Sequence, residues 1–351
     1  MDQQLPANEE KPAPRRRKGS RAWKLARRTF LLLLFLPAAF FLLFQWQPVQ
    51  DWMAKQVTSS ISKTLETRVA VEKVRLSWLD ELTIEGLFIE DKYGDTLLYG
   101  KTLEAEFTLF PWLQIEHILI ADTRFQIRRN LGDPESNLTT ALNKLFPPKE
   151  KANNPLDLDL ERVDLQRIRF VQNDSVKGQR FDISLASGII RLDNLNLPDN
   201  EVRIAEAELR EPLVKQTSIP PSPIDPALLR LDSIIKQAAD TNSLRITANS
   251  IEVIDGGYAL DNLRKDPIAS SDITAVDFGR LGISNIDLEL IDTEFYNGDF
   301  IGALKHLSLE EKSGFVLDRL SVQDLKISPT ELQLYDLELV TAESSLSDSL
   351  R

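Results

Sequence analysis

The stretch VRLSWLDELTIEGLFIEDKYGDTLLYGKTLEAEF at residues 74–107 decides the fold, because apolar and polar residues alternate along most of it. A period of two places successive side chains on opposite faces of a β-strand. The turn KYGDTLLY at residues 92–99 separates two such runs. The stretch therefore predicts β-strands with one apolar face and one solvated face.

The same alternation returns along the rest of the chain, between residues 163 and 204 and between residues 244 and 339. A looser repeat lies beneath it, in which apolar residues are separated first by two positions and then by one. Examples are IEHILIAD at residues 115–122 and LERVDL at residues 160–165. Serial strand units without strong helical segments between them predict an elongated antiparallel sheet.

Three segments interrupt the strands. Residues 130–155 predict a short helix that ends before Pro147 and Pro148, followed by a charged linker. Residues 216–243 predict a Pro-rich loop and a helix whose first turn holds Asp225 and Pro226. Residues 255–272, DGGYALDNLRKDPIASSD, predict a polar loop.

A sheet with one apolar face must cover that face in one of two ways. It can pack a second layer and form a dry core, or it can curl incompletely and leave an apolar trough for acyl chains. Leu, Ile, Val and Phe serve both outcomes, so the alternation leaves both open. The candidate groove-lining residues are Val74, Leu76, Leu82, Ile84, Leu87, Ile89, Phe107, Leu109, Ile118, Ile120, Ile168, Phe170, Ile183 and Leu185.

Upstream of the strands, a basic block precedes the apolar run TFLLLLFLPAAFFLLFQW at residues 29–46. About 18 residues in a helix reach roughly 27 Å, which is close to one hydrocarbon core. The run continues past the small residues Ala38 and Ala39, so we favour an uncleaved anchor over a cleaved signal peptide. Basic residues on one side predict a cytoplasmic amino terminus.

The residues that carry this interpretation form two sets. The topology residues are Arg15, Arg16, Arg17, Lys18, Arg27 and Arg28. The membrane-anchor residues are Phe30, Leu31, Leu32, Leu33, Leu34, Phe35, Leu36, Phe40, Phe41, Leu42, Leu43 and Phe44. After the anchor, apolar residues at three- and four-residue spacing predict an amphipathic helix at residues 47–67, either as a cap on the next domain, which we favour, or as a membrane-surface helix.

Charge and composition exclude several classes of function. The net charge is −12; because residues 1–28 carry nine basic and three acidic residues, the remainder carries −12 − 6 = −18. So acidic a body is unsuited to nucleic acid. The chain has no cysteine and only His117 and His306, for which we expect structural roles. No Gly-rich phosphate loop is present. We therefore expect no enzyme activity, metal or cofactor.

The order of basic tail, single span, exit helix and serial strands resembles the amino-terminal portion of the AsmA-like superfamily, in particular TamB-like subunits of the translocation and assembly module. The resemblance is most specific between Val49 and Arg128, and it extends to GQRFDISL at 178–185 and EEKSGFVLDRLSV at 310–322. Members of this family are several times longer, so we expect this chain to be an amino-terminal piece or the product of a truncated reading frame.

The resemblance implies a mainly β protein of the bacterial inner membrane, with its body in the periplasm and its sheet curled into a half-pipe, or β-groove, with an apolar interior. It implies a conduit for phospholipids between the inner and outer membranes. The alternative is a scaffold that assists outer-membrane protein assembly by β-augmentation, with an outer-membrane barrel protein as partner. A passive stalk with a dry interior is a third possibility.

The expected organisation has eight parts. They are a basic tail (1–28), a transmembrane helix (29–46), an amphipathic helix (47–67), a first β-groove segment (68–129), a helix and linker (130–155), a second β-groove segment (156–215), a Pro-rich loop and helix (216–243) and a third β-groove segment (244–351).

Overall fold

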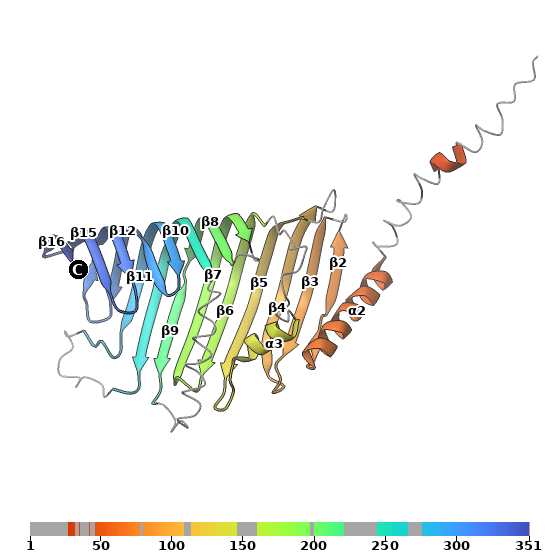
Figure 1. Ribbon diagram of the computed structural model, residues 1–351, viewed down its shortest axis with the longest axis horizontal. Helices are drawn as coiled ribbons and strands as arrows, with labels where there is room; N and C mark the ends of the chain where they lie inside the picture. Colours follow the sequence, from red (N-terminus) through yellow and green to blue (C-terminus); the bar gives the residue numbers. More distant parts are fainter. Residues whose placement is uncertain are drawn as a thin grey trace, which may run out of the picture. The chain divides into compact units, whose positions relative to one another are not determined.

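The described residues of the computed structural model are 27–31, 35, 42, 46–77, 80–108, 114–145, 160–196, 200–220, 244–265 and 276–350. Their helices include α2 (Gln47–Leu65) and α3 (Asn137–Leu145), and the rest is dominated by strands (Figure 1). The prediction of a mainly β protein with few helices is confirmed. The predicted helix at 226–238 and most of the predicted anchor lie outside the described residues.

The strands are numbered in chain order. They are β1 (Val69–Ala70), β2 (Lys73–Ser77), β3 (Glu81–Glu90), β4 (Thr96–Thr108), β5 (Gln114–Arg129), β6 (Arg162–Asp174), β7 (Gln179–Asn196), β8 (Glu201–Arg210), β9 (Leu213–Ser218), β10 (Arg245–Asn262), β11 (Gly282–Tyr296), β12 (Asp299–Glu311), β13 (Val316–Leu317), β14 (Arg319–Ile327), β15 (Leu332–Val340) and β16 (Ser345–Leu350).

In the part of the chain that the structure describes, these strands form one sheet of 16 strands whose spatial order follows the sequence. Most neighbours are antiparallel, but β6 runs parallel to β5, and β10 runs parallel to both β8 and β9. The expectation of a wholly antiparallel sheet is therefore wrong at these pairings. At both places a long connection, 130–161 or 219–244, returns the chain to the end where the previous strand began, and a parallel pairing needs such a crossover.

The predicted polar loop at 255–272 is wrong in its first half, because residues 255–262 belong to β10. Gly256 and Gly257 suggested a loop, but they lie at a register shift inside the strand. On one side of β10, two shorter strands lie end to end. They are β8, which pairs with the first half of β10, and β9, which pairs with the second half, and Glu211 and Pro212 separate them.

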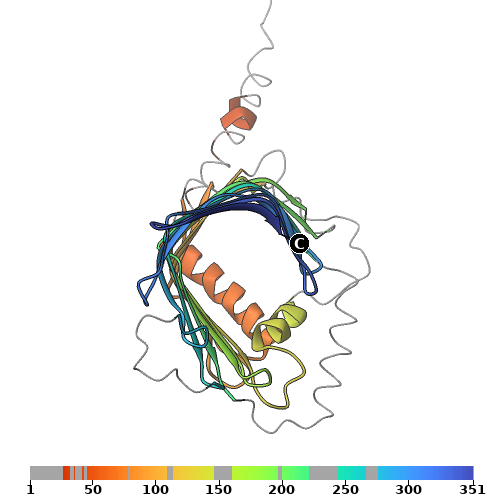
Figure 2. The same cartoon turned by 90° about the vertical axis from the view of Figure 1, so that its left-hand side faces the viewer.

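A row of backbone irregularities crosses the sheet near the middle of its strands. Each member has a positive φ, between 50° and 66°, where its strand skips a position in the register or breaks. We call this the bulge row: Gly86, Asp122, Arg167, Glu211, Asp255 and Asn285. Bulges bend a strand and increase its twist, and the sheet is curved when viewed along the row of strands (Figure 2).

The concave side of the sheet holds α3 and the part of α2 from Gln50 onward, which belongs to the same unit as the sheet (Figure 2). Gln50 Nε2 donates a hydrogen bond to Leu76 O, 3.3 Å away, and Ser62 Oγ accepts one from Val69 N at 3.0 Å. Leu76 belongs to β2 and Val69 to β1, and both strands lie at the first edge of the sheet. The helix therefore bonds to backbone groups of strands at the edge of the sheet.

The most closely packed apolar side chains lie among the last strands. Leu304, Val322, Leu325 and Leu337 form a buried cluster, with exposed fractions between 2% and 9%. They come from β12, β14 and β15 and lie on one face of the sheet, because Leu304 is opposite Val322 and Val322 is opposite Leu337.

Candidate functional site: the inner face of the sheet

One face of the sheet carries unbroken rows of apolar side chains. Residues opposite each other in register share a face, so each row can be followed from strand to strand. The first row, from β2 to β15, is Leu76, Leu82, Ala105, Ile118, Val163, Ile190, Ala207, Ile251, Leu290, Leu304, Val322 and Leu337.

Two further rows accompany the first. The second, on the same side of the bulge row, is Val74, Ile84, Leu103, Ile120, Leu165, Gly188, Leu209, Val253, Leu288 and Leu307. The third, beyond the bulge row, is Val69, Ile89, Leu98, Phe125, Phe170, Ile183, Val214, Tyr258 and Ile283. We call the face with these rows the inner face. Its Ile127 is buried on β5, the strand that α3 contacts, and α3 lies on the concave side of the sheet (Figure 2).

The bulge row reverses which residues point inward along a strand. In β5 the inward residues are Ile118 and Ile120 before Asp122, then Phe125 after it. Inward-pointing residues therefore have even numbers before Asp122 and odd numbers after it. In the other strands that the row crosses the change falls at the same height, so the apolar rows stay on one face.

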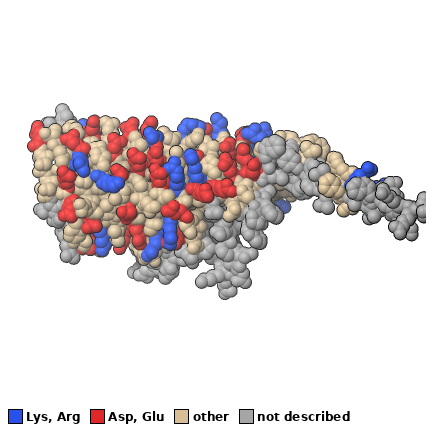
Figure 3. Space-filling model, turned by 90° about the horizontal axis from the view of Figure 1, so that it is seen from above, with Lys and Arg blue, Asp and Glu red and all other residues tan. Residues whose placement is uncertain are grey.

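The opposite, outer face is charged. Acidic and basic side chains are interspersed over the convex side of the sheet (Figure 3). Many form ion pairs, such as Lys305 with Glu289 at 2.9 Å. His117 lies between two carboxylates, with Nε2 2.9 Å from Asp164 and Nδ1 3.4 Å from Glu106. Exposed pairs of this kind add little stability, but they keep the outer face solvated.

Arg162 and His117 also lower the pKa of Asp164. Burial raises the pKa of Asp164, but hydrogen bonds from Arg162 and His117 outweigh burial and hold its pKa below the ordinary value. The arrangement is a polar network across the outer faces of β5 and β6. The structural role expected for His117 stays a prediction.

Most inner-face side chains are neither buried nor fully exposed. Leu103, Ile120, Leu165, Leu209 and Val253 are all half-buried, in contrast to the cluster of β12, β14 and β15. Across the described residues no second sheet packs on this face. The middle strands therefore present an apolar surface that covers itself only in part.

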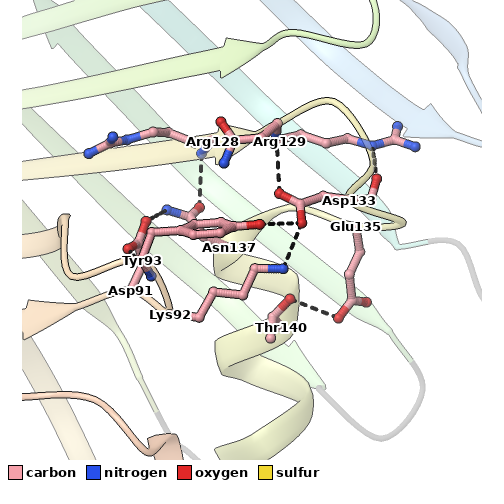
Figure 4. Close-up of polar contacts among 10 residues, drawn as sticks. Asp91, Lys92, Tyr93, Arg128, Arg129, Asp133, Glu135, Asn137 and Thr140 are labelled. Carbon is pink, nitrogen blue, oxygen red and sulfur yellow. Dashed lines mark hydrogen bonds and ion pairs between the residues drawn. The ribbon is translucent and has the colours of Figure 1, made fainter. Parts of the chain in front are cut away.

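A polar cluster holds α3 at one end of β3, β4 and β5 (Figure 4). Asn137 is 4% exposed and begins the helix; its Nδ2 donates to Asp91 Oδ2 at 2.9 Å and its Oδ1 accepts from Arg128 N at 2.9 Å. Asp133 accepts from Lys92 Nζ at 2.8 Å and from the Tyr93 hydroxyl at 2.5 Å. We call these five residues, Asp91, Lys92, Tyr93, Asp133 and Asn137, the α3 polar cluster.

The other end of α3 contacts the end of α2. Lys144 Nζ donates to Leu65 O at 3.0 Å and pairs with Glu66 at 2.6 Å. A positive charge at a helix carboxyl terminus is favourable. Polar contacts of Lys144 thus join the carboxyl-terminal ends of α2 and α3 beside the first strands of the sheet.

An open hollow of about 610 Å³ lies at the bulge row between β6 and β11. Its lining combines apolar groups such as Leu185 and Pro212 with Arg167 and Arg169. Arg167 makes two hydrogen bonds to Asp122, at 2.5 and 2.8 Å, and Arg169 makes two to Asp182, at 3.0 and 2.7 Å. Both guanidinium groups already have carboxylate partners, so the hollow has no preformed anion site.

The structure brings together almost all of the candidate groove residues. Those from Val74 to Phe107 and from Ile118 to Leu185 lie on the inner face, and Leu109 lies outside the described residues. The candidate set omitted inward residues of the same rows, such as Leu103, Leu165 and Leu209. Their apolar character in alternating runs was the available signal.

Most of the anchor and topology residues lie outside the described residues. Phe30, Leu31, Phe35 and Leu42 are described and exposed, as are Arg27 and Arg28. The other anchor residues and Arg15, Arg16, Arg17 and Lys18 lie outside the described residues. A search of the described helices finds none with the length and apolar character needed to cross a bilayer.

Groups of metal-binding side chains are also absent among the described residues. In comparisons with known proteins, no family model matches the chain and no curated protein matches it.

Proposed function

We propose that this protein is a non-enzymatic conduit for phospholipids, with its curved sheet acting as a half-pipe that holds acyl chains on the inner face. The observation that supports this proposal is the continuity of the apolar rows, which run through strand after strand without a charged member. A dry core would need only local clusters, as in β12, β14 and β15. A path for a long apolar ligand needs continuity.

The energetics of such a surface suit transport better than storage. Burial of a methylene group is worth about 0.8 kcal/mol relative to water, so an acyl chain on the inner face avoids a large cost. A lipid that moves from a bilayer to the inner face exchanges one apolar environment for another, so its free energy changes little. Small differences along the path allow lipid to enter and leave.

In this proposal the amino-terminal segment anchors the protein in a bacterial inner membrane, the body lies in the periplasm, and the partners are phospholipids. The basic block before residue 29 and the acidic body after it support that topology. An outer-membrane barrel protein is the expected partner at the far end. Neither a cofactor nor an energy-supplying nucleotide enters the mechanism.

The test places charge on the inner face and uses the adjacent outer residues as the matched control. Leu165→Lys with Ile251→Lys should abolish co-purification of phospholipid with the full chain. Gln166→Lys with Ser250→Lys, one residue along the same strands, should leave it unchanged. Mass spectrometry of lipid bound to the purified protein measures the result. Equal lipid content in both double variants would refute the conduit.

An assembly scaffold is the alternative; among the described strands, β16 pairs with β15 along one side. A strand from an unfolded outer-membrane protein could pair there. Leu346→Pro would then reduce capture of such a protein and leave bound phospholipid unchanged. Loss of lipid without loss of capture would favour the conduit alone.

A further inference from the structure

Among the described residues, the outer face has a region where positive charge is in excess. It lies beyond the bulge row, where β5, β6, β7 and β9 are neighbours. Apart from Arg128, which pairs with Asp95 at 2.5 Å, its charged outward residues are four cations and one carboxylate. We call it the basic patch: Arg124, Arg169, Arg180, Lys215 and, at its centre, Asp182. The patch carries 4 − 1 = +3 in a chain whose net charge is −12.

The cations of the patch share a single counter-charge. Arg169 lies 2.7 Å from Asp182 and Arg180 lies 4.0 Å from it. The hydrogen bond from Arg169 lowers the pKa of Asp182 most, and the charges of Arg180 and Lys215 lower it further. No carboxylate of the described residues forms an ion pair with Arg124 or Lys215.

The placement of Arg124 is unfavourable for the isolated protein. Arg124 and Arg169 are opposite each other on neighbouring strands, and like charges in that position destabilise a sheet. Elsewhere on the outer face, cations such as Arg162 and Lys305 have carboxylates within 3 Å. An excess of exposed, unpaired cations at one place is the pattern expected of a binding surface for an anionic partner.

We propose that the basic patch binds an acidic segment of a partner protein. Arginine guanidinium groups match carboxylates in geometry, and the exposed ring of Tyr99, which is opposite Arg124, offers apolar contact beside them. Nucleic acid and anionic bilayers fit less well. Both are extended surfaces that would also meet the acidic remainder of the convex outer face, whereas a short peptide reaches the patch alone.

The experiment measures binding of a fluorescent peptide of alternating Glu and Gly to the full chain at low salt. Arg124→Glu with Lys215→Glu should weaken binding about tenfold or more, since two attractive contacts become repulsive. The matched control, Lys55→Glu with Lys63→Glu on α2, makes the same change of net charge at exposed residues and should have little effect. The pair Arg124→Gln with Lys215→Gln should give an intermediate loss.

Three results would overturn the proposal. Equal losses in the patch and control variants would show that net charge alone attracts the peptide. Patch-dependent binding of vesicles of phosphatidylglycerol and phosphatidylcholine, without peptide binding, would assign the patch to a membrane. Patch-dependent self-association would assign it to a second copy. Circular dichroism confirms folding of each variant, and bound lipid should be unchanged because the patch faces away from the groove.

Discussion

At the scale of single residues, Asn137 is a buried polar residue whose hydrogen bonds hold the start of α3 in place. Its side chain is buried and bonds to Asp91, to the backbone of Arg128 and to Gln126 O at 3.1 Å. Replacing it with Ala leaves these groups without their partners, which typically costs about 1–3 kcal/mol. We expect Asn137→Ala to reduce the hydrogen-exchange protection of α3 while β14 keeps its protection. Unchanged protection of α3 would contradict the role assigned to Asn137.

Asp133 gives α3 a dependence on pH. Burial raises the pKa of Asp133, but bonds from Lys92, Tyr93 and Asn130 outweigh it, so the pKa is lowered. A lowered folded-state pKa contributes stability above the ordinary value near 3.9 and loses it as pH falls below. The pKa of Lys92 is raised, chiefly by its hydrogen bond to Asp133, so its contribution is lost only at strongly alkaline pH.

We therefore expect α3 to loosen below about pH 4 and to remain docked through neutral pH. Hydrogen exchange, converted to opening free energies at each pH, measures the effect. In Asp133→Asn the docking should be weaker at neutral pH and the acid dependence should be smaller. An acid dependence as steep as that of the wild type would show that other carboxylates control the helix.

At the scale of the elements, the bulge row crosses a curved sheet, and bulges of this kind bend strands. Asn285 has a φ of 51°, a conformation that glycine adopts freely and that a β-branched residue resists. Asn285→Gly should be nearly neutral, whereas Asn285→Val should destabilise the protein by about 1–3 kcal/mol. Urea unfolding of both variants measures the difference. Equal midpoints would mean that the backbone at Asn285 relaxes without cost.

The strands were predictable from the sequence because alternation is a local property. Residues 82–85 and 181–185 alternate so clearly that their inward members follow directly. The parity change at Asp122 was visible only as a gap of three between Ile120 and Thr123, and a gap of that size also fits a turn. In β10, Gly256 and Gly257 carried the same ambiguity, and the loop prediction there was wrong.

The α3 polar cluster could not be predicted in the same way. The short helix was expected from its apolar residues at 138, 141, 142 and 145. Asp91 and Asn137, however, are 46 positions apart in the chain and meet only because β3, β4 and β5 are adjacent. The parallel pairings have the same origin, since they depend on where a long connection returns to the sheet.

At the scale of the whole sheet, one property connects fold and proposed function. Apolar rows follow the inner face, the longest from β2 to β15, and charged side chains are interspersed over the outer face (Figure 3). A sheet of this kind needs an apolar partner on one side and water on the other. In the proposed conduit, phospholipid acyl chains lie on the inner face, and the lipid head groups remain solvated at the open side of the curve.

The most direct test of the conduit is a photocrosslinking scan along β6, with p-benzoylphenylalanine at one position at a time in the full chain and phospholipid as the crosslinked ligand. The account predicts lipid crosslinks at Val163 and Leu165, then, after the parity change at Arg167, at Ile168 and Phe170. It predicts none at Gln166 and Arg169. Crosslinks that are absent, or equal at inward and outward positions, would contradict it.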